Sequence, residues 1–413
     1  MANTFNLGNG NWAQKTEKLL AYNAENDNYK PLPFDFDRAS SATRVNKQGL
    51  IETVATDEPR IDFLNNSKGH LLLEPSRKND VTYSNDISTY SNFGSTDDVN
   101  VTISPDGSQN ASSFEGNGVY DQVLLSSSSM TLASAGSYTI SVFAKKGTNN
   151  FMQLFANGFT GASNTEAYFD LENGTTPTSG ANIEDYGSGW YRCSTTVTID
   201  AGDLVGILSV RVTPSTSDFR WSPISANVGK SVFVYGFQME AGSYATSYIP
   251  TSGSAVTRSA ETNYQQNVTQ VIGQSEGTMY IEFVPKDTLA PIQILCQIRS
   301  SSGTIGQTDI RLQGGNIRAL ANDGGSNQFN IDGGSYTAGT TYKVAIRYKL
   351  NDSKLYINGS SVGSDTSCSF TGSSLDQISF AENLSSLLPV ADILDARLYD
   401  TGLSDAELIA LTT

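Results

Sequence analysis

The sequence contains one histidine, His70, and only three cysteines, which are far apart: Cys193, Cys296 and Cys368. No Cys-x-x-Cys motif or Cys/His pair exists, so a zinc site is not expected. Any Ser-His-Asp or Cys-His chemistry would have to use His70, which begins an apolar run and is expected to be a structural or surface residue. The cysteines are expected to be buried free thiols of a chain made in a reducing cytosol.

Charge is also scarce, and positive charge most of all. Charged residues make up 16% of the 413 residues, and 26 Lys and Arg stand against 42 Asp and Glu, a net charge of −16. This balance argues against a nucleic-acid binder, which needs a basic face. No apolar run approaches the roughly 18 residues of a membrane helix. The first residues, Met1–Phe5, lack the basic and apolar regions of a secretory signal, so none is expected.

Helix signals are few. One short helix is expected at Trp12–Asn23, and a second follows the capping box Ser404–Glu407 at the C-terminus. Most of the chain alternates short Val-, Ile-, Tyr-, Phe- and Thr-rich runs with Gly, Asn, Asp and Ser, which is typical of β-sandwiches. Asn173-Gly174 and Asn358-Gly359 predict type I′ hairpins. The expected fold class is all-β, with two antiparallel β-sandwiches after an irregular N-terminal segment.

Changes in composition divide the chain into four parts. Residues 1–80 are irregular and are expected to serve attachment or assembly. Residues 81–262 and 278–413 are dense in strand signals, and the second part ends in the capped helix. The Gln-rich stretch 263–277 is expected to be a linker.

Two blocks of sequence resemble segments that recur in virion proteins of tailed bacteriophages. The first block comprises Arg38–Val45, Gly49–Glu52, Pro59–Asp62 and Leu71–Asn79. The second comprises Tyr138–Lys145, Gly189–Cys193, Tyr235–Gly242 and Thr246–Thr251. The resemblance covers most of residues 34–262. It implies a fibre, appendage or adsorption protein with a jelly roll similar to carbohydrate-binding modules.

The C-terminal part carries a second resemblance. Residues 278–413 resemble a concanavalin A-like sandwich of the laminin G or pentraxin type. The segments that carry this resemblance are a first strand at Gly277–Val284, a hairpin at Lys354–Gly359, and the closing run Asp395–Asp400 before Leu403–Glu407. The resemblance implies this fold and a tendency to bind glycans. It does not define a ligand, because sandwiches host many functions.

Glycan sites combine an aromatic platform with polar side chains, because sugar rings present apolar C–H faces. The candidate glycan-binding residues are Tyr186, Phe219, Arg220 and Trp221. A core position is the alternative for Trp221, and Trp190 is expected in the core.

Arginines recur beside acidic residues near the N-terminus, which predicts structural ion pairs. The residues expected to form them are Arg38, Arg44, Arg60, Arg77, Glu52 and Glu74, with Arg258 and Glu261 repeating the pattern later. These pairs would hold residues 34–80 against the jelly roll or a neighbouring subunit.

Catalytic and metal signals are weak. Retaining glycosidases need two carboxylates on one face, but Glu282 has no carboxylate two residues away, and Asp392 and Asp395 are three residues apart. No enzyme, metal site or cofactor is therefore expected. Oxygen-rich loops leave structural calcium as an alternative, with the candidates Asn322, Asp323, Asp332, Asn351 and Asp352.

Together these features predict a non-enzymatic phage virion protein, made in the host cytoplasm. It would form an exposed homotrimeric fibre or appendage that contacts host surface glycans, with other virion proteins bound through the N-terminal segment. Nucleic acid and membrane insertion are not expected. One alternative is a head-fibre or capsid decoration protein without a glycan ligand. Another is an appendage that degrades polysaccharide, and a bacterial surface lectin is a third.

Overall fold

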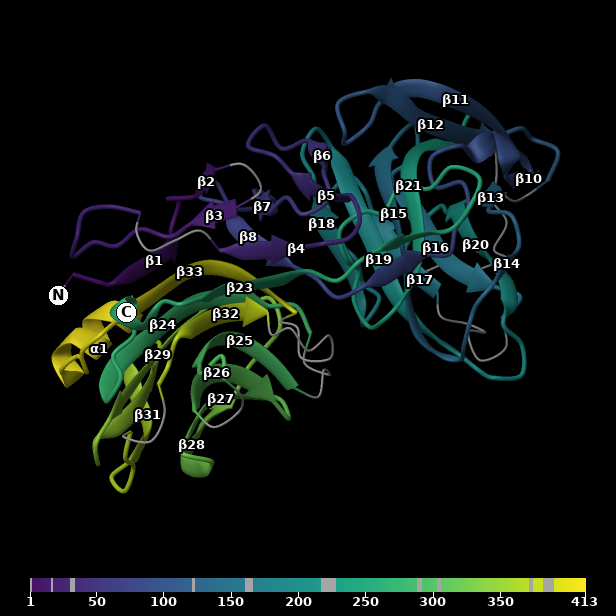
Figure 1. The fold of residues 1–413 in the computed structure, drawn as a ribbon. Coiled ribbons are helices and arrows are strands. Elements are labelled where there is room, and N and C mark those ends of the chain that lie inside the picture. The colour runs from purple at the N-terminus through teal and green to yellow at the C-terminus, as the bar shows by residue number, and fades with distance from the viewer. Residues whose placement is uncertain are drawn as a thin grey trace. The chain divides into compact units, whose positions relative to one another are not determined.

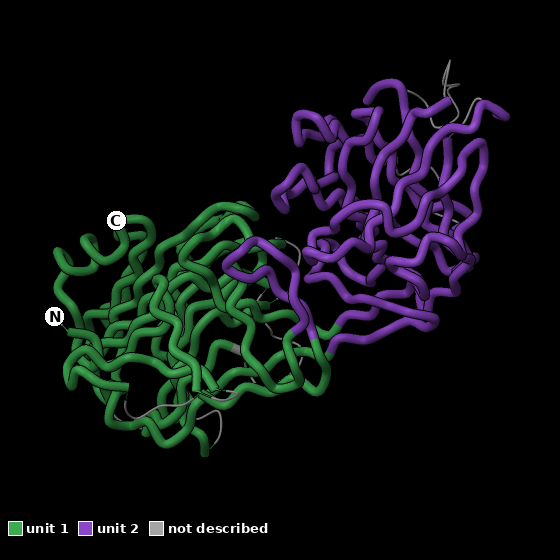
Figure 2. The backbone as a smooth tube through the Cα atoms, turned by 90° about the horizontal axis from the view of Figure 1, so that it is seen from above, with its two compact units in different colours: residues 1–41, 54–76, 259–413 green, residues 42–53, 77–258 purple. Residues whose placement is uncertain are grey.

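A computed structural model describes most of the chain, namely residues 2–15, 18–29, 34–120, 123–159, 166–216, 228–287, 292–302, 306–370, 374–381 and 390–413. Antiparallel strands dominate these residues (Figure 1), which confirms the all-β prediction. Two compact units are formed (Figure 2). Unit 1 contains residues 1–41, 54–76 and 259–413, and unit 2 contains residues 42–53 and 77–258.

Unit 1 is a sandwich of two large sheets. One has the order β31 (Ser360–Asp365), β30 (Ser353–Ile357), β29 (Tyr342–Lys349), β24 (Glu276–Pro285), β33 (Ala391–Tyr399), β8 (His70–Leu73), β7 (Ile61–Asp62), with β1 (Phe5–Gly8) also on β33. The other has the order β28 (Ser326–Ser335), β27 (Asn316–Asp323), β26 (Gln307–Gln313), β25 (Ile292–Arg299), β32 (Gln377–Ala381), β23 (Thr262–Gln266), β4 (Asp35–Asp37). Met279, Ile281 and Phe283 of β24 belong to a core shared with Ile298 and Ile310 of the second sheet.

Short strands from the N-terminal residues complete both sheets of unit 1. Strand β33 pairs with β24 on one side, and with β1 and β8 on the other (Figure 1). Strand β4 pairs with β23, which lies in the expected linker, as does the 3-10 turn η2 (Thr269–Val271). The structure therefore divides the chain differently from the predicted boundaries. Strands of two to four residues are too short to show a clear hydrophobic alternation in the sequence. They form because they pair with the edges of longer strands.

Unit 2 is a second sandwich with its own core. One sheet has the order β10 (Ser91–Phe93), β13 (Leu124–Ser126), β20 (Val205–Val212), β16 (Phe151–Asn157), β17 (Glu166–Asp170), and β14 (Met130–Thr131) also pairs with β20. The other has the order β11 (Ser95–Ile103), β12 (Gln109–Gly116), β21 (Ser231–Ala241), β15 (Gly136–Lys146), β19 (Trp190–Ile199), β18 (Ala181–Asp185). Smaller elements are the hairpin β5 (Ala42–Val45) and β6 (Ile51–Val54), the pair β9 (Arg77–Asn79) and β22 (Val256–Arg258), and η1 (Ile87–Thr89).

The prediction of a short helix at Trp12–Asn23 is wrong. The described residues there form a hairpin of β2 (Ala13–Lys15) and β3 (Lys18–Leu20). Leu19 is buried while both its neighbours are partly exposed, which is the alternation of a strand. An alternation of buried and exposed residues over only three positions is a weak sequence signal. The polar residues around it therefore favour the prediction of a helix.

The C-terminal helix and one of the two turns agree with the sequence. Helix α1 (Asp405–Thr412) begins at Ser404 with the expected capping box to Glu407. Asn358 and Gly359 have φ of +47° and +80°, as a type I′ turn requires. At Asn173-Gly174 only the glycine is left-handed, and the loop spans Asp170 to Thr175, so the type I′ prediction is wrong there.

All three cysteines are buried and free, as expected. Trp190 is 2% exposed and lies in the core, and its Nε1 donates a hydrogen bond to the Ile103 carbonyl at 3.0 Å. Within the described part of the chain, no helix is long and apolar enough to cross a membrane.

A buried ion cluster of Arg38, Arg60, Glu74 and Glu261 joins three distant parts of the chain inside unit 1. Arg60 donates to both carboxylate oxygens of Glu261 at 2.6 Å and to Glu74 at 2.9 Å. Arg38 donates to Glu261 at 2.9 Å, and the backbone N–H of Glu74 donates to the same carboxylate at 2.7 Å. The cluster therefore holds the N-terminal residues beside β23.

The cluster is fully enclosed and formally neutral. The Arg38, Arg60 and Glu261 side chains are 0% exposed. Arg38 also donates to the carbonyls of Ser40 and Glu58. Burial alone would lower the pKa of Arg60, but Glu261 and Glu74 raise it above its ordinary value. The ion pairs and hydrogen bonds within the cluster thus replace the interactions with water that each charge lost on burial.

The remaining arginines of the predicted set belong to unit 2. Arg44 pairs with Glu52 at 2.8 Å across the β5–β6 hairpin and is partly exposed. Arg77 lies 4.0 Å from the buried Glu240, and its guanidinium lies over the Tyr244 ring. The expected residues therefore do meet carboxylates, but they stabilise two different units and not one N-terminal segment.

We expect Arg60→Met to lower the free energy of unfolding by about 3–5 kcal/mol, because it leaves two buried carboxylates without their main partner. Arg44→Met is the matched control, and breaking its partly exposed pair should cost less than about 1 kcal/mol. Urea unfolding of the two full-length variants measures both values. Equal and small losses would contradict the role of the cluster.

Candidate functional site

The residues predicted to bind glycans do not form a described site. Phe219, Arg220 and Trp221 lie outside the described residues. Tyr186 follows β18, is half-buried, and contacts Phe143 edge-to-face at a centroid distance of 4.8 Å. Phe143 in turn contacts Tyr235 and Tyr248. Tyr186 therefore belongs to an aromatic cluster, and its role in glycan binding stays a prediction.

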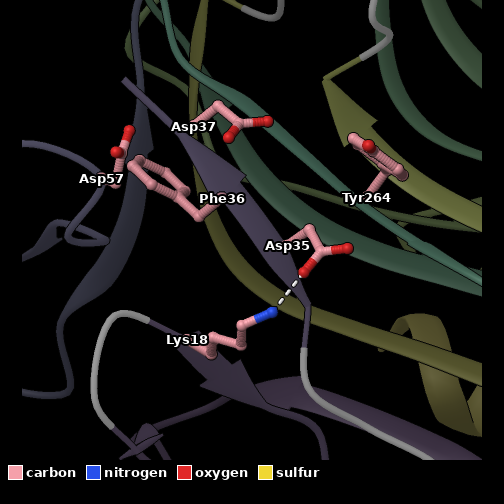
Figure 3. Close-up of a pocket in the computed structure, with 6 residues that line it drawn as sticks. All are labelled: Lys18, Asp35, Phe36, Asp37, Asp57 and Tyr264. Carbon is pink, nitrogen blue, oxygen red and sulfur yellow. Dashed lines mark hydrogen bonds and ion pairs between the residues drawn. The ribbon is translucent and has the colours of Figure 1, made fainter. Parts of the chain in front are cut away.

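An open pocket in unit 1 offers a different site, here called the Tyr264 pocket (Figure 3). It has a volume of about 310 Å³ and is lined by Lys18, Asp35, Phe36, Asp37, Asp57 and Tyr264. Pockets of a few hundred Å³ fit small ligands.

The edge strand β4 positions the pocket. Its sequence Asp35-Phe36-Asp37 alternates, so the buried Phe36 joins the core while the two carboxylates share the other face. Tyr264 on β23 lies directly opposite Asp35 in the register of the two strands. Lys18 on the β2–β3 hairpin forms an ion pair with Asp35.

The pocket combines an aromatic ring with an excess of acceptors. Figure 3 shows Asp35, Asp37 and Tyr264 around one opening, with Phe36 directed away toward Asp57. Asp57 accepts a hydrogen bond from the backbone N–H of Arg38 at 2.8 Å. Lys18 and Asp35 are 44% and 47% exposed, so both can contact a solute. Three carboxylates against one ammonium group give the pocket a formal charge of −2.

Sequence reasoning missed this pocket for two reasons. Lys18 was expected in a helix, and Tyr264 in a linker. Asp35 and Asp37 stand just before Arg38 in the sequence, which favours an ion-pair role for them and not a binding site. The alternation Asp-Phe-Asp was the available signal, because it places two carboxylates on one face of a strand whose centre is apolar. That the face lies beside an aromatic ring depends on pairing between residues more than 220 positions apart.

A second carboxylate pair in unit 1 lies across two neighbouring strands. Glu282 of β24 lies opposite Asp395 of β33. Asp395 is buried, and both its oxygens are bound by Arg397, at 2.5 Å and 3.3 Å. Burial raises the pKa of Asp395, although Arg397 opposes the shift. Because Arg397 occupies this carboxylate, the pair does not offer a free acid beside a nucleophile.

The oxygen-rich loops considered for calcium are partly neutralised by arginines. Asp332 pairs with Arg318 at 2.7 Å, and Asp352 pairs with Arg347 at 2.6 Å. Among the described residues, no group of three or more His, Cys, Asp or Glu side chains is placed to hold a metal ion.

The single histidine belongs to a buried polar group. The Nε2 atom of His70 lies 3.2 Å from Asp392 and 3.9 Å from Asp62, and Lys286 lies 2.8 Å from Asp392. Burial alone would raise the pKa of Asp392. Electrostatic interactions and hydrogen bonds with His70 and Lys286 instead hold that pKa well below its usual range. The group joins β8 to β33, so its role is structural.

Comparison with solved structures gives partial matches at low sequence identity. The CBM40 module of a Ruminococcus gnavus IT-sialidase, bound to α2,3 sialyllactose, is 18% identical, covers 36% of this chain and 91% of its own, and has a TM-score of 0.31. Domain 4 of AbnA, an extracellular arabinanase from Geobacillus stearothermophilus, in complex with arabinotriose, is 14% identical, covers 37% and 73%, and has a TM-score of 0.31.

The native heptameric SAP-like pentraxin of Limulus polyphemus is 13% identical, covers 34% of this chain and 74% of its own, and has a TM-score of 0.29. No protein-family model matches the chain, and no curated protein matches it either. Identities and TM-scores this low describe a partial likeness in fold and do not define a ligand.

We expect the stability of Asp392 variants to depend on pH. A carboxyl whose pKa is depressed in the folded state stabilises the fold above its unfolded pKa of about 3.9, and this contribution is lost as the pH falls through the folded pKa. Asp392→Asn should therefore be less stable than the wild type at pH 7, and the difference should shrink between about pH 5 and pH 2. Urea unfolding across this range measures it. A difference that is constant with pH would contradict the assignment.

Proposed function

We propose that the chain is a non-enzymatic virion protein of a tailed bacteriophage, which forms an exposed homotrimeric fibre or appendage and binds uncharged glycans of the host surface. The virion role is supported by the sequence blocks within residues 34–262 that resemble such proteins. Glycan binding is supported by the Tyr264 pocket. A native mass of three chains of 44.2 kDa each in light scattering would support the trimer. Attachment through residues 1–80 stays a prediction.

The Tyr264 pocket carries the proposal because its chemistry suits a pyranose. The ring of Tyr264 can stack on the C–H face of a sugar, while Asp35 and Asp37 accept hydrogen bonds from its hydroxyl groups. Lys18 adds a donor at the rim. These groups stand on two paired strands, so their spacing is set by the sheet.

The negative charge of the pocket favours uncharged sugars over anionic ones. Three carboxylates and one ammonium group line the pocket, so a sugar that carries its own carboxylate would be repelled. Neutral hexoses and N-acetylhexosamines fit this balance. Uronic and sialic acids do not.

The test is binding of the full chain to tetrasaccharides, measured by calorimetry. The neutral probes are β1,4-linked glucose and β1,4-linked N-acetylglucosamine, and the anionic probe is α1,4-linked galacturonate. We expect binding to a neutral probe, and Tyr264→Ala should weaken it about tenfold through loss of stacking, while Tyr264→Phe retains it. Tyr29→Ala is the control, because Tyr29 is 44% exposed and packs on Tyr22 outside the pocket.

Other outcomes favour the alternatives. Preference for the galacturonate probe would contradict the charge argument. A full chain that binds none of a broad array of neutral glycans would favour a decoration protein without a sugar ligand. Release of reducing sugar from a bound polysaccharide would favour the degrading appendage.

A further inference from the structure

An aromatic patch on unit 2 lies outside the Tyr264 pocket. It consists of Phe93, Val119, Tyr120 and Val228, which are 44%, 67%, 52% and 72% exposed. The rings of Phe93 and Tyr120 are stacked, with centroids 4.4 Å apart and an angle of 14° between their planes. Contiguous exposed apolar side chains often mark a surface that binds a ligand or partner, whereas single exposed ones do not.

The backbone holds this aromatic patch in place. The N–H of Asn117 donates to the Gly94 carbonyl, and its side-chain amide donates to the Ser95 carbonyl, both at 3.1 Å. Gly116 bonds with both Gly229 and Lys230, which brings Val228 beside the loop. Gly118 has a φ of +78°, and a Cβ there would lie 2.8 Å from Val228. The platform is therefore organised before any ligand arrives.

Polar side chains are present in the segment that carries Phe93. Asn92, next to Phe93, donates a hydrogen bond to Asp97, and Ser95 donates to the Asn92 side-chain oxygen at 3.0 Å. The exposed Asn92 amide and the Asp97 carboxylate are thus fixed in the same short segment as Phe93, and the buried Ser95 hydroxyl holds the amide in place. Sugars need this combination, because a pyranose presents C–H groups on its faces and hydroxyl groups around its rim.

A second copy of the chain suits the patch less well. Four apolar side chains are few, since stable protein interfaces use about 20–30 residues on each side. The neighbouring edge strand β11 is also interrupted by register shifts between Asp98 and Thr102, and between Thr102 and Ile103. Such bulges oppose pairing of an edge with another chain. Four side chains, two of them stacked rings, instead suit one or two sugar rings.

We infer that the aromatic patch is a second glycan-contact site, which stacks an uncharged pyranose on the Phe93–Tyr120 pair. This inference rests on the proposed function and gives each chain one sugar site on each unit. Asp97 and the nearby Asp98 and Glu115 favour neutral sugars here too. Two weak sites on one chain would raise its avidity for a repeating polysaccharide.

The test uses the same two neutral tetrasaccharides and four full-length proteins: wild type, Tyr264→Ala, the double variant Phe93→Ala/Tyr120→Ala, and the triple variant. Calorimetry should give two sites per wild-type chain. Tyr264→Ala and the double variant should each keep one site of unchanged affinity, while the affinity of the substituted site falls about tenfold. The triple variant should bind at least tenfold more weakly than Tyr264→Ala. Val205→Ala is the control on unit 2, because Val205 is 48% exposed outside the patch. Circular dichroism verifies that each variant is folded.

The outcomes separate this inference from the proposed function. If Tyr264→Ala removes all binding and the double variant binds as the wild type does, the patch is not a glycan site, although the proposed function stands. If the wild type binds no probe and no neutral glycan on an array, both fail. If the double variant changes the native mass in light scattering without changing sugar binding, the patch is an interface between copies and the inference is overturned.

Discussion

The buried ion cluster is the constraint on which unit 1 depends. Arg38 and Arg60 come from the N-terminal residues, Glu74 follows β8, and Glu261 precedes β23. Moving four charges out of water is costly, and the arrangement is tolerable only when all four meet with good geometry. The N-terminal strands must therefore assemble with residues 259–413 as one folded structure. The Tyr264 pocket inherits this dependence, because Asp57 bonds the Arg38 backbone and β4 pairs with β23.

Patterns within a few residues predicted what local physics determines. The capping box at Ser404, the turn at Asn358-Gly359, the core position of Trp190 and the all-β class all follow from short spacings. The arginine–carboxylate signal was real, but sequence could not pair Arg38 with Glu261 across 223 positions. Nor could it reveal that β23 is a strand between two others, because its polar residues Gln265 and Gln266 suggest a linker. Which strands and which charged residues pair is decided by tertiary structure, so these pairings could not be predicted from the sequence.

The two candidate glycan surfaces follow different designs. The Tyr264 pocket sets one ring among carboxylates on paired strands, so hydrogen bonding would dominate its selectivity. The aromatic patch presents two stacked rings with a thin polar border, so shape and stacking would dominate there. Both surfaces are acidic in character, in keeping with the net charge of −16, and both therefore point to uncharged sugars.

The central structural claim is that the N-terminal strands and the C-terminal sandwich fold as one cooperative unit. Native-state hydrogen exchange of the full chain tests it most directly. If the claim holds, the backbone amides of β1 and β8 exchange with the same free energy of opening as those of β24 and β33, because the four strands open together. If β1 and β8 exchange at a much lower free energy while β24 and β33 remain protected, the N-terminal residues form a separate segment and the account is contradicted.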